Sequence, residues 1–158
     1  MAYLNLDREK TETTVEELNV LLADYHLYYQ ELRNFHWNVE GTNFFDLHEQ
    51  FEEMYDDAKE KIDEIAERIL TLRFTPDSNM TTYLEKSNIK ESPKGLNDRQ
   101  MVDTLLEDHE IIIQQMRKVV NTADKANDEG TIDLVGAYIR ELEKTSWMLD
   151  VWTKKIKN

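Results

Sequence analysis

Apolar residues recur every three or four positions over four long stretches of the chain, the spacing that places them on one face of an α helix. The first stretch predicts a helix over residues 14–39. Thr13 and Thr14 each stand three residues before a glutamate, so two overlapping capping boxes are expected to begin this helix. Gly41 is expected to end it, because glycine suits the left-handed conformation after a helix.

The same periodicity predicts three further helices, over residues 43–72, 97–126 and 132–157. The third has a plausible cap at its start, where Asn97 stands three residues before Gln100. Each of these stretches is long enough to cross a small domain from end to end.

The longest irregular stretch, residues 73–97, contains both prolines of the chain, Pro76 and Pro93. Within it, residues 80–86 could form a short helix. A connection of this length could join two parallel long helices, whereas the other two connections are short. The pattern predicts an all-α, ferritin-like four-helix bundle with a short extra helix in the crossover between the second and third long helices.

The composition fits one such domain over residues 1–158, with a short N-terminal extension over residues 1–12. No stretch has the length of a membrane span or the character of a signal peptide, so a cytoplasmic protein without a membrane role is expected. The absence of cysteine excludes disulfides and thiolate ligands. The net charge of −14 opposes binding to nucleic acid, although it can equally serve solubility alone.

The four histidines, His26, His36, His48 and His109, all fall in predicted helices. None is preceded three residues earlier by a glutamate, so the Glu-x-x-His motif of ordinary di-iron bundles is missing. A metal site of the usual kind inside one bundle is therefore not expected. Packing or surface roles are expected for His26 and His109.

The second predicted helix carries His48, Glu52, Asp63 and Glu67 on one stripe, a set that suits iron, manganese or zinc. His48 and Asp63 are 15 residues apart, about 22 Å along a straight helix, whereas metal–ligand bonds are only about 2 Å. Two copies of this helix, antiparallel across a two-fold axis, would bring the two ends together, and His36 could approach from the first helix. The spacing alone also fits ordinary surface residues.

At these residues the sequence resembles the Dps family, the mini-ferritins also called DNA-binding proteins from starved cells. The resemblance extends from about Val15 to Trp152 and is most specific in the histidine and acidic motifs. Its segments are Asn34-Phe-His-Trp-Asn-Val-Glu-Gly41, Phe44-Phe-Asp-Leu-His48, Phe51-Glu-Glu-Met-Tyr55, Asp63-Glu-Ile-Ala-Glu-Arg68, Tyr83-Leu-Glu and Trp147-Met-Leu.

The resemblance implies a ferroxidase, an enzyme that oxidises ferrous iron, with sites for two iron ions between subunits. It implies that His36 and His48 of one subunit and Asp63 and Glu67 of the two-fold-related subunit are the ligands. Glu52 stands where the family often has aspartate, so it keeps a carboxylate on a longer side chain. Zinc or manganese would suit the same ligands.

The resemblance also implies a hollow shell of twelve subunits that oxidises iron preferentially with hydrogen peroxide, stores ferric oxide and protects against oxidative damage. Trp37 resembles the tryptophan beside the family's site, where it would donate electrons or quench radicals; packing at the interface is the alternative. Asp124, Glu129 and Asp133, around an expected turn at residues 128–130, resemble the acidic lining of the family's iron-entry pores, or form a solvated acidic turn.

The sequence departs from DNA-binding members of the family, which usually carry a flexible lysine-rich tail. Residues 1–12 contain only Arg8 and Lys10 as basic residues, beside three acidic ones. DNA binding is therefore not expected at physiological salt. The alternatives to a ferroxidase are a nucleoid-compacting DNA-binding protein with little oxidase activity, and a structural helical bundle without metal.

Overall fold

The computed structural model describes residues 3–154, and these form five α helices and no strand. The helices are α1 (Arg8–Asn38), α2 (Phe44–Thr71), α3 (Met80–Lys86), α4 (Asp98–Ala126) and α5 (Glu129–Thr153). The expected all-α architecture is confirmed, including the short helix in the crossover.

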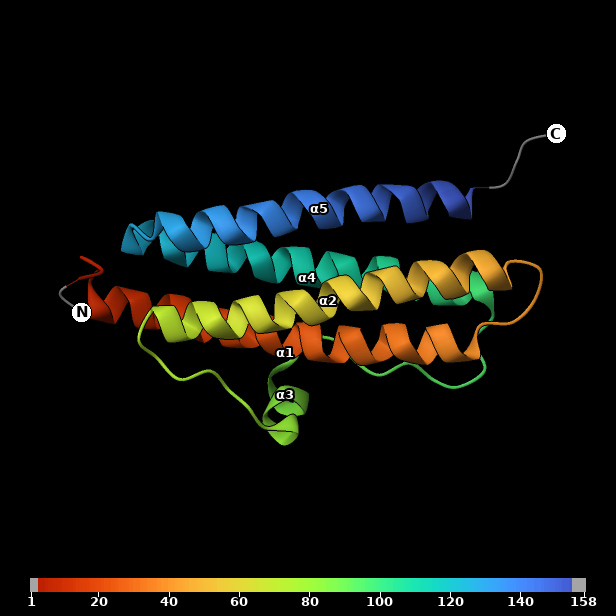
Figure 1. Cartoon of the computed structure of the whole chain (residues 1–158), viewed down its shortest axis with the longest axis horizontal. Coiled ribbons are helices and arrows are strands. Elements are labelled where there is room, and N and C mark those ends of the chain that lie inside the picture. The colour runs from red at the N-terminus through yellow and green to blue at the C-terminus, as the bar shows by residue number, and fades with distance from the viewer. Residues whose placement is uncertain (1–2, 155–158) are drawn as a thin grey trace.

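The four long helices form two antiparallel hairpins, α1 with α2 and α4 with α5, and α1 packs against α4 between them (Figure 1). The long crossover returns the chain so that α2 and α4 run in the same direction, and α3 lies beside α1 (Figure 1). The turn between α1 and α2, the beginning of α4 and the end of α5 therefore gather at one end of the bundle.

The first helix begins at Arg8, well before the predicted start near residue 14. The Asp7 carboxylate accepts a hydrogen bond from the backbone N–H of Lys10 at 3.0 Å and caps the helix. Thr14 is fully buried inside α1, so the predicted capping boxes are wrong. At the other end Val39 is the extended cap residue, and Gly41 takes a left-handed φ of 101° within the turn that follows, rather than capping the helix itself.

The beginning of α4 was predicted correctly, because Asn97 and Gln100 form a reciprocal capping box. The fifth helix begins at Glu129, earlier than the predicted residue 132, because the buried Asp128 carboxylate accepts from the backbone N–H of Thr131 at 3.0 Å. Its predicted last residues, 155–157, lie outside the described part of the chain.

The core draws large apolar side chains from all four long helices. Burying each such side chain stabilises the fold by about 1.5–3 kcal/mol. The fully buried set includes Leu18, Leu22, Leu32, Phe35, Phe51, Ile65, Ile69, Leu105, Ile112, Met116 and Val135.

The crossover is fastened to α1 by the fully buried carboxylate of Asp24. It accepts hydrogen bonds from the Ser87 hydroxyl at 2.9 Å and from the backbone N–H of Asn88 at 2.7 Å. Burial raises the pKa of Asp24, and these hydrogen bonds partly offset the rise. The long irregular connection is thereby held in one position.

His109 has the packing role that was expected for it. Tyr28 donates to its Nε2 at 2.7 Å, its Nδ1 lies 2.8 Å from the Ser146 hydroxyl, and that hydroxyl donates to the Leu142 carbonyl at 2.6 Å. Burial lowers the pKa of His109 to about 3, so the ring is neutral and links three helices. His26 stacks on Tyr83 at 3.9 Å and docks α3 onto α1.

Asp108 is a buried acid whose Oδ2 atom has no hydrogen-bond partner among the described residues. Burial raises its pKa from 3.8 to about 7, together with smaller contributions from the negative charges of Glu31, Glu107 and Asp24. At a pH between 3.8 and about 7, Asp108 is protonated in the folded chain and ionised in the unfolded chain. Unfolding therefore releases a proton in this pH range. Stability therefore falls as pH rises through that window.

We expect Asp108→Asn to stabilise the protein by a few kcal/mol at about pH 8 and by little at about pH 4. The apparent melting temperature at each pH, measured at one scan rate, tests this. Glu107→Gln, at an exposed neighbouring position, is the control and should give a much smaller gain. A gain for Asp108→Asn that is larger at low pH would contradict the expectation.

Candidate metal site

His36 and His48 come together where α1 ends and α2 begins. Their rings stack with centroids 3.7 Å apart and planes inclined by 16°. Each Nδ1 atom lies 2.7 Å from the backbone carbonyl oxygen of the other histidine. The short turn through Gly41 brings α2 back beside α1 and so makes this reciprocal pairing possible.

The reciprocal hydrogen bonds decide which nitrogen of each ring is protonated. A carbonyl oxygen can only accept, so both Nδ1 atoms must donate. In the neutral rings, Nε2 then keeps its lone pair, and no hydrogen bond within residues 3–154 uses either Nε2 atom. A histidine that binds metal through Nε2 usually donates its Nδ1–H to a neighbouring acceptor such as a backbone carbonyl, which fixes the orientation of the ring. The two rings are therefore fixed in orientations that leave each Nε2 atom able to bind a metal ion.

Two aromatic side chains enclose the histidine pair. Phe44 stacks on His48 with centroids 4.9 Å apart, and Tyr55 meets His36 edge-on at 5.3 Å. The Tyr55 hydroxyl donates to the exposed Glu52 carboxylate at 3.2 Å. Partial burial raises the pKa of Tyr55, and the hydrogen bond to Glu52 and that residue's charge raise it further. Tyr55 had been assigned no role from the sequence, although it lies within a family motif.

Asp63 and Glu67 lie on the exposed surface of α2, far along the helix from His48. The intervening residues are continuously helical, so the separation of about 22 Å expected for 15 residues applies. Within residues 3–154 of one chain, no three histidine or acidic side chains are grouped closely enough to hold a metal ion. A single chain therefore brings the two histidines together and leaves both acids apart from them.

Trp37 is 58% exposed, although it follows His36 directly in sequence. Its ring lies under the guanidinium of Arg33, 4.9 Å from the ring centroid. The same guanidinium lies 5.1 Å from the ring centroid of Tyr29. The histidine pair is thus contacted by Tyr55 rather than by Trp37.

The three acids expected at the pore flank the turn between α4 and α5. They are Asp124, Glu129 and Asp133, and all three are exposed. The neighbouring Asp128 is buried instead and pairs with Arg68 of α2. The structure uses Asp128 for the fold and leaves Glu129 facing solvent.

Arg68 is a structural residue for which the sequence alone assigned no role. Its Nε donates to the Thr131 hydroxyl at 2.9 Å, and its guanidinium lies against Gly130, where a Cβ would come within 2.7 Å of Nη2. Arg68 follows Glu67 directly in sequence. Neighbouring positions of α2 therefore carry a candidate metal ligand and the residue that binds Asp128 and Thr131 at the α4–α5 connection.

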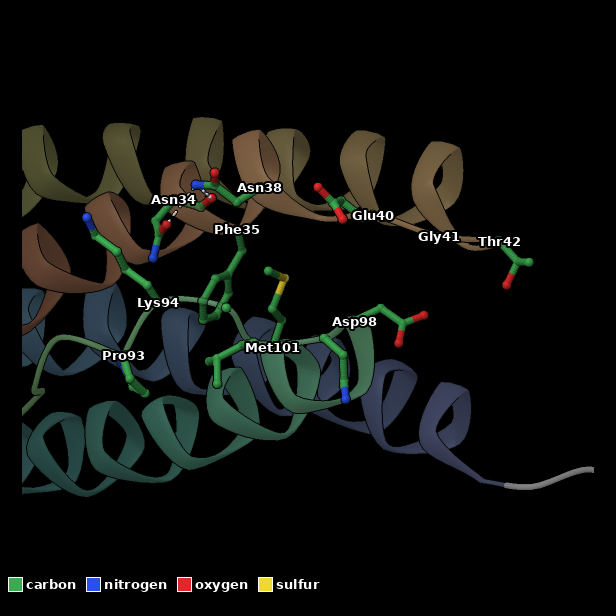
Figure 2. A pocket seen from close by; sticks show the side chains of 13 residues that line it. Asn34, Phe35, Asn38, Glu40, Gly41, Thr42, Pro93, Lys94, Asp98 and Met101 are labelled. Carbon is green, nitrogen blue, oxygen red and sulfur yellow. Dashed lines mark hydrogen bonds between the residues drawn. The ribbon is translucent and has the colours of Figure 1, made fainter.

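A polar hollow of about 960 Å³ opens at the same end of the bundle, between the turn that joins α1 to α2 and residues 93–98 (Figure 2). Glu40, Asp98 and Lys94 line it. On its wall the Asn38 amide donates a hydrogen bond to the side-chain oxygen of Asn34 at 3.0 Å. None of the candidate ligands lines this hollow.

Comparison with known proteins agrees with this architecture. Residues 15–158 match the family model described as a ferritin-like domain. The chain is 42% identical over 135 residues to "DNA protection during starvation protein 2" of Bacillus anthracis, covering 85% of this chain and 92% of the relative. It is 39% identical over 150 residues to the "DNA protection during starvation protein" of Porphyromonas gingivalis, covering 95% and 94%.

Among solved structures, the Dps protein of Vibrio cholerae O1 superposes with a TM-score of 0.92 at 41% identity, covering 96% of this chain and 95% of that one. That protein is described as a member of a broad superfamily of ferritin-like diiron-carboxylate proteins. The chain therefore belongs to the ferritin-like family and, within it, to the Dps proteins. Within residues 3–154, no helix is both long and apolar enough to cross a membrane.

Proposed function

We propose that this protein is a ferroxidase and iron store whose catalytic sites lie between two subunits. The observation that carries the proposal is the reciprocal fixing of His36 and His48, which leaves both Nε2 lone pairs available. Membership of the Dps proteins, with a relative described as diiron-carboxylate, supports iron as the metal. Iron here is the substrate and the stored cargo.

Each proposed site combines ligands from α1 and α2 of one subunit with ligands from α2 of a second subunit, related to the first by a two-fold axis. His36 and His48 supply imidazole nitrogens, and Asp63 and Glu67 of the partner subunit supply the carboxylates that one chain cannot bring near. Glu52 lies on the histidine side and is the candidate ligand for a second iron ion. Zinc or manganese would suit the same ligands in place of iron.

Two ferrous ions held together would let one molecule of hydrogen peroxide accept two electrons in a single event. The oxygen–oxygen bond breaks, two ferrous ions become ferric, and two protons convert the fragments into two molecules of water. The carboxylates offset the growing positive charge, and the imidazoles hold the geometry. Because no one-electron fragment of peroxide is released, this reaction would protect macromolecules from hydroxyl radicals.

Ferric oxide would collect inside a hollow shell of twelve subunits in the cytoplasm. Asp124, Glu129 and Asp133 would line the entry pores, since all three are exposed beside the α4–α5 turn. Rings of carboxylates attract cations and would guide ferrous iron inward. The pairing of Arg68 with Asp128 supports this role because it holds the turn in place.

Mass measurement by size-exclusion chromatography with light scattering tests the proposal, together with ferrous oxidation by peroxide under anaerobic conditions and, separately, by oxygen. We expect a dodecamer that consumes one peroxide for every two ferrous ions, and that oxidises iron faster with peroxide than with oxygen. A monomer with no oxidation above the protein-free rate would contradict the proposal.

The competing function is DNA compaction, and it makes a separate prediction. Several relatives are named for DNA protection during starvation. Here Arg8 and Lys10 belong to the first turns of α1, and Arg8 lies over the ring of Phe74, 4.6 Å from its centroid. With a net charge of −14, we expect no retardation of DNA by sub-micromolar protein in about 150 mM salt. Retardation under those conditions would support compaction instead.

A further inference from the structure

A positively charged side chain is buried in the groove between α2 and α5. Lys61 of α2 is only 5% exposed, and lysine is almost never fully buried unless it is paired. Its ammonium donates to the Asp57 carboxylate at 2.5 Å and lies 2.9 Å from the Glu141 carboxylate of α5. The ring centroid of Tyr138 lies 5.1 Å from the same Nζ atom. The ammonium is therefore held by two carboxylates and one aromatic face.

The two carboxylates that hold Lys61 are open to solvent. The side chains of Asp57 and Glu141 are 57% and 54% exposed. Both line a hollow of about 290 Å³, whose lining also includes the buried side chains of Tyr25 and Leu142. Dissolved metal ions can therefore reach the carboxylates, whereas the fold covers the ammonium.

The ammonium occupies the point that a divalent cation would take between the same two carboxylates. Such cations bind carboxylate oxygens at about 2.0–2.6 Å, and one or two carboxylates can suffice when water completes the coordination. The oxygens of Asp57 and Glu141 lie 2.5 Å and 2.9 Å from Nζ, so a cation at this point would contact both. The protein fills the point with a positive charge that is covalently attached.

The groove lies on a different side of α2 from the proposed iron ligands. Successive residues of a helix are turned by about 100°, so Lys61 and Asp63 point in nearly opposite directions. Asp63 is exposed, whereas Lys61 reaches across to Glu141 of α5. Among the described residues that line the hollow, none is a histidine. A metal ion in the groove would therefore be a single ion without imidazole ligands.

A single ferrous ion in the groove would be harmful in a protein that meets hydrogen peroxide. It would give one electron to peroxide, whose oxygen–oxygen bond breaks. The products are one ferric ion, one hydroxide ion and one hydroxyl radical, which balances atoms, charge and electrons. The proposed site between subunits avoids the radical because two ferrous ions supply both electrons.

We propose that Lys61 excludes ferrous iron and other divalent cations from the groove between α2 and α5, and so confines iron to the sites between subunits. The consequence for iron rests on the proposed ferroxidase function, whereas the exclusion itself does not. Because α2 holds the ammonium beside its carboxylates, its effective concentration there is high. A free cation that displaced it would leave a buried positive charge without a partner, which is unfavourable. Lys61 thus determines where metal binds, in addition to linking α2 to α5.

Binding of Mn²⁺ to the assembled protein tests this inference, with the free ion measured by electron paramagnetic resonance. Manganese suits carboxylate and water ligands. Lys61→Met keeps most of the side-chain volume and removes the ammonium. Lys144→Met is the matched control, because Lys144 lines the same hollow and is exposed. Glu141→Gln removes one of the two carboxylates, and circular dichroism verifies the fold of each variant.

We expect Lys61→Met to bind one more Mn²⁺ per subunit than wild type, with a dissociation constant of about 10⁻⁴–10⁻³ M, the range of weak carboxylate sites. Lys144→Met should bind the same number as wild type, and so should Glu141→Gln. Adding Glu141→Gln to Lys61→Met should abolish the extra ion. A salt bridge with a purely structural role predicts equal numbers in all of these proteins, and equal binding by folded Lys61→Met and wild type would overturn the inference.

A lower number in Glu141→Gln than in wild type would also overturn the inference, because it would place a metal ion in the groove despite Lys61. This comparison holds even if Lys61→Met does not fold. With ferrous iron and peroxide, Lys61→Met should release more hydroxyl radical to a spin trap than Lys144→Met. If wild type oxidises no iron, the proposed ferroxidase fails, whereas the Mn²⁺ numbers still decide the role of Lys61.

Discussion

Replacing both His36 and His48 with alanine is expected to reduce peroxide-driven iron oxidation to the rate of a protein-free solution. The change removes the two imidazole ligands on one side of every proposed site. Each Nδ1 is held by a backbone carbonyl, which remains after substitution of the other side chain. Either single variant should therefore keep one correctly oriented ligand and lose only part of the rate. Stopped-flow absorbance of ferric iron measures this.

The double variant should keep its assembly state, because the pair contributes little to the apolar core. Glu49→Gln, at an exposed position beside His48, is the matched control and should oxidise iron at the wild-type rate. Unchanged oxidation in an intact double variant would remove the histidine pair from the mechanism.

Replacing Asp63 with asparagine and Glu67 with glutamine together is expected to cause a comparable loss. These changes keep the shape of the side chains and remove the two negative charges that would offset the charge of bound iron. The loss would arise although, within one chain, Asp63 lies about 22 Å and Glu67 about 28 Å along α2 from His48. Ferrous binding measured by anaerobic calorimetry should fall together with the oxidation rate.

The control for this pair is Glu60→Gln, an exposed acid on the same helix. If the acidic variant bound and oxidised iron as wild type does, the carboxylates would have to come from elsewhere, and the two-subunit site would be wrong.

The helical architecture could be predicted because apolar periodicity reports directly on burial. The helix ends were less predictable, since several residues can cap and only the packed structure decides among them. Asp7 and the two threonines at positions 13 and 14 all have suitable side chains, but Thr14 is fully buried within the helix. At the same end of the bundle, Asp128 caps α5 and is also bound by Arg68 of α2.

The candidate site was predictable as a set of residues but not as a geometry. Spacing on α2 indicated that His48 and Asp63 cannot share one ion within a chain. No sequence pattern indicates that His36 and His48 exchange hydrogen bonds with each other's backbone, because that depends on how closely α1 and α2 approach. The contact between the rings of Tyr55 and His36 could not be predicted for the same reason, since it crosses between the two helices.

The most direct test of the account is complementation between the two inactive variants. Subunits that lack His36 and His48 are co-assembled in equal amounts with subunits that carry Asp63→Asn and Glu67→Gln. In a two-fold dimer of one of each, one site loses both histidines and both substituted acids, and the other site keeps all of its ligands. Random pairing should therefore restore about a quarter of the wild-type sites, and with them about a quarter of the oxidation rate. Mixed assemblies, verified by native mass spectrometry, that remain as inactive as either parent would contradict a site shared between subunits.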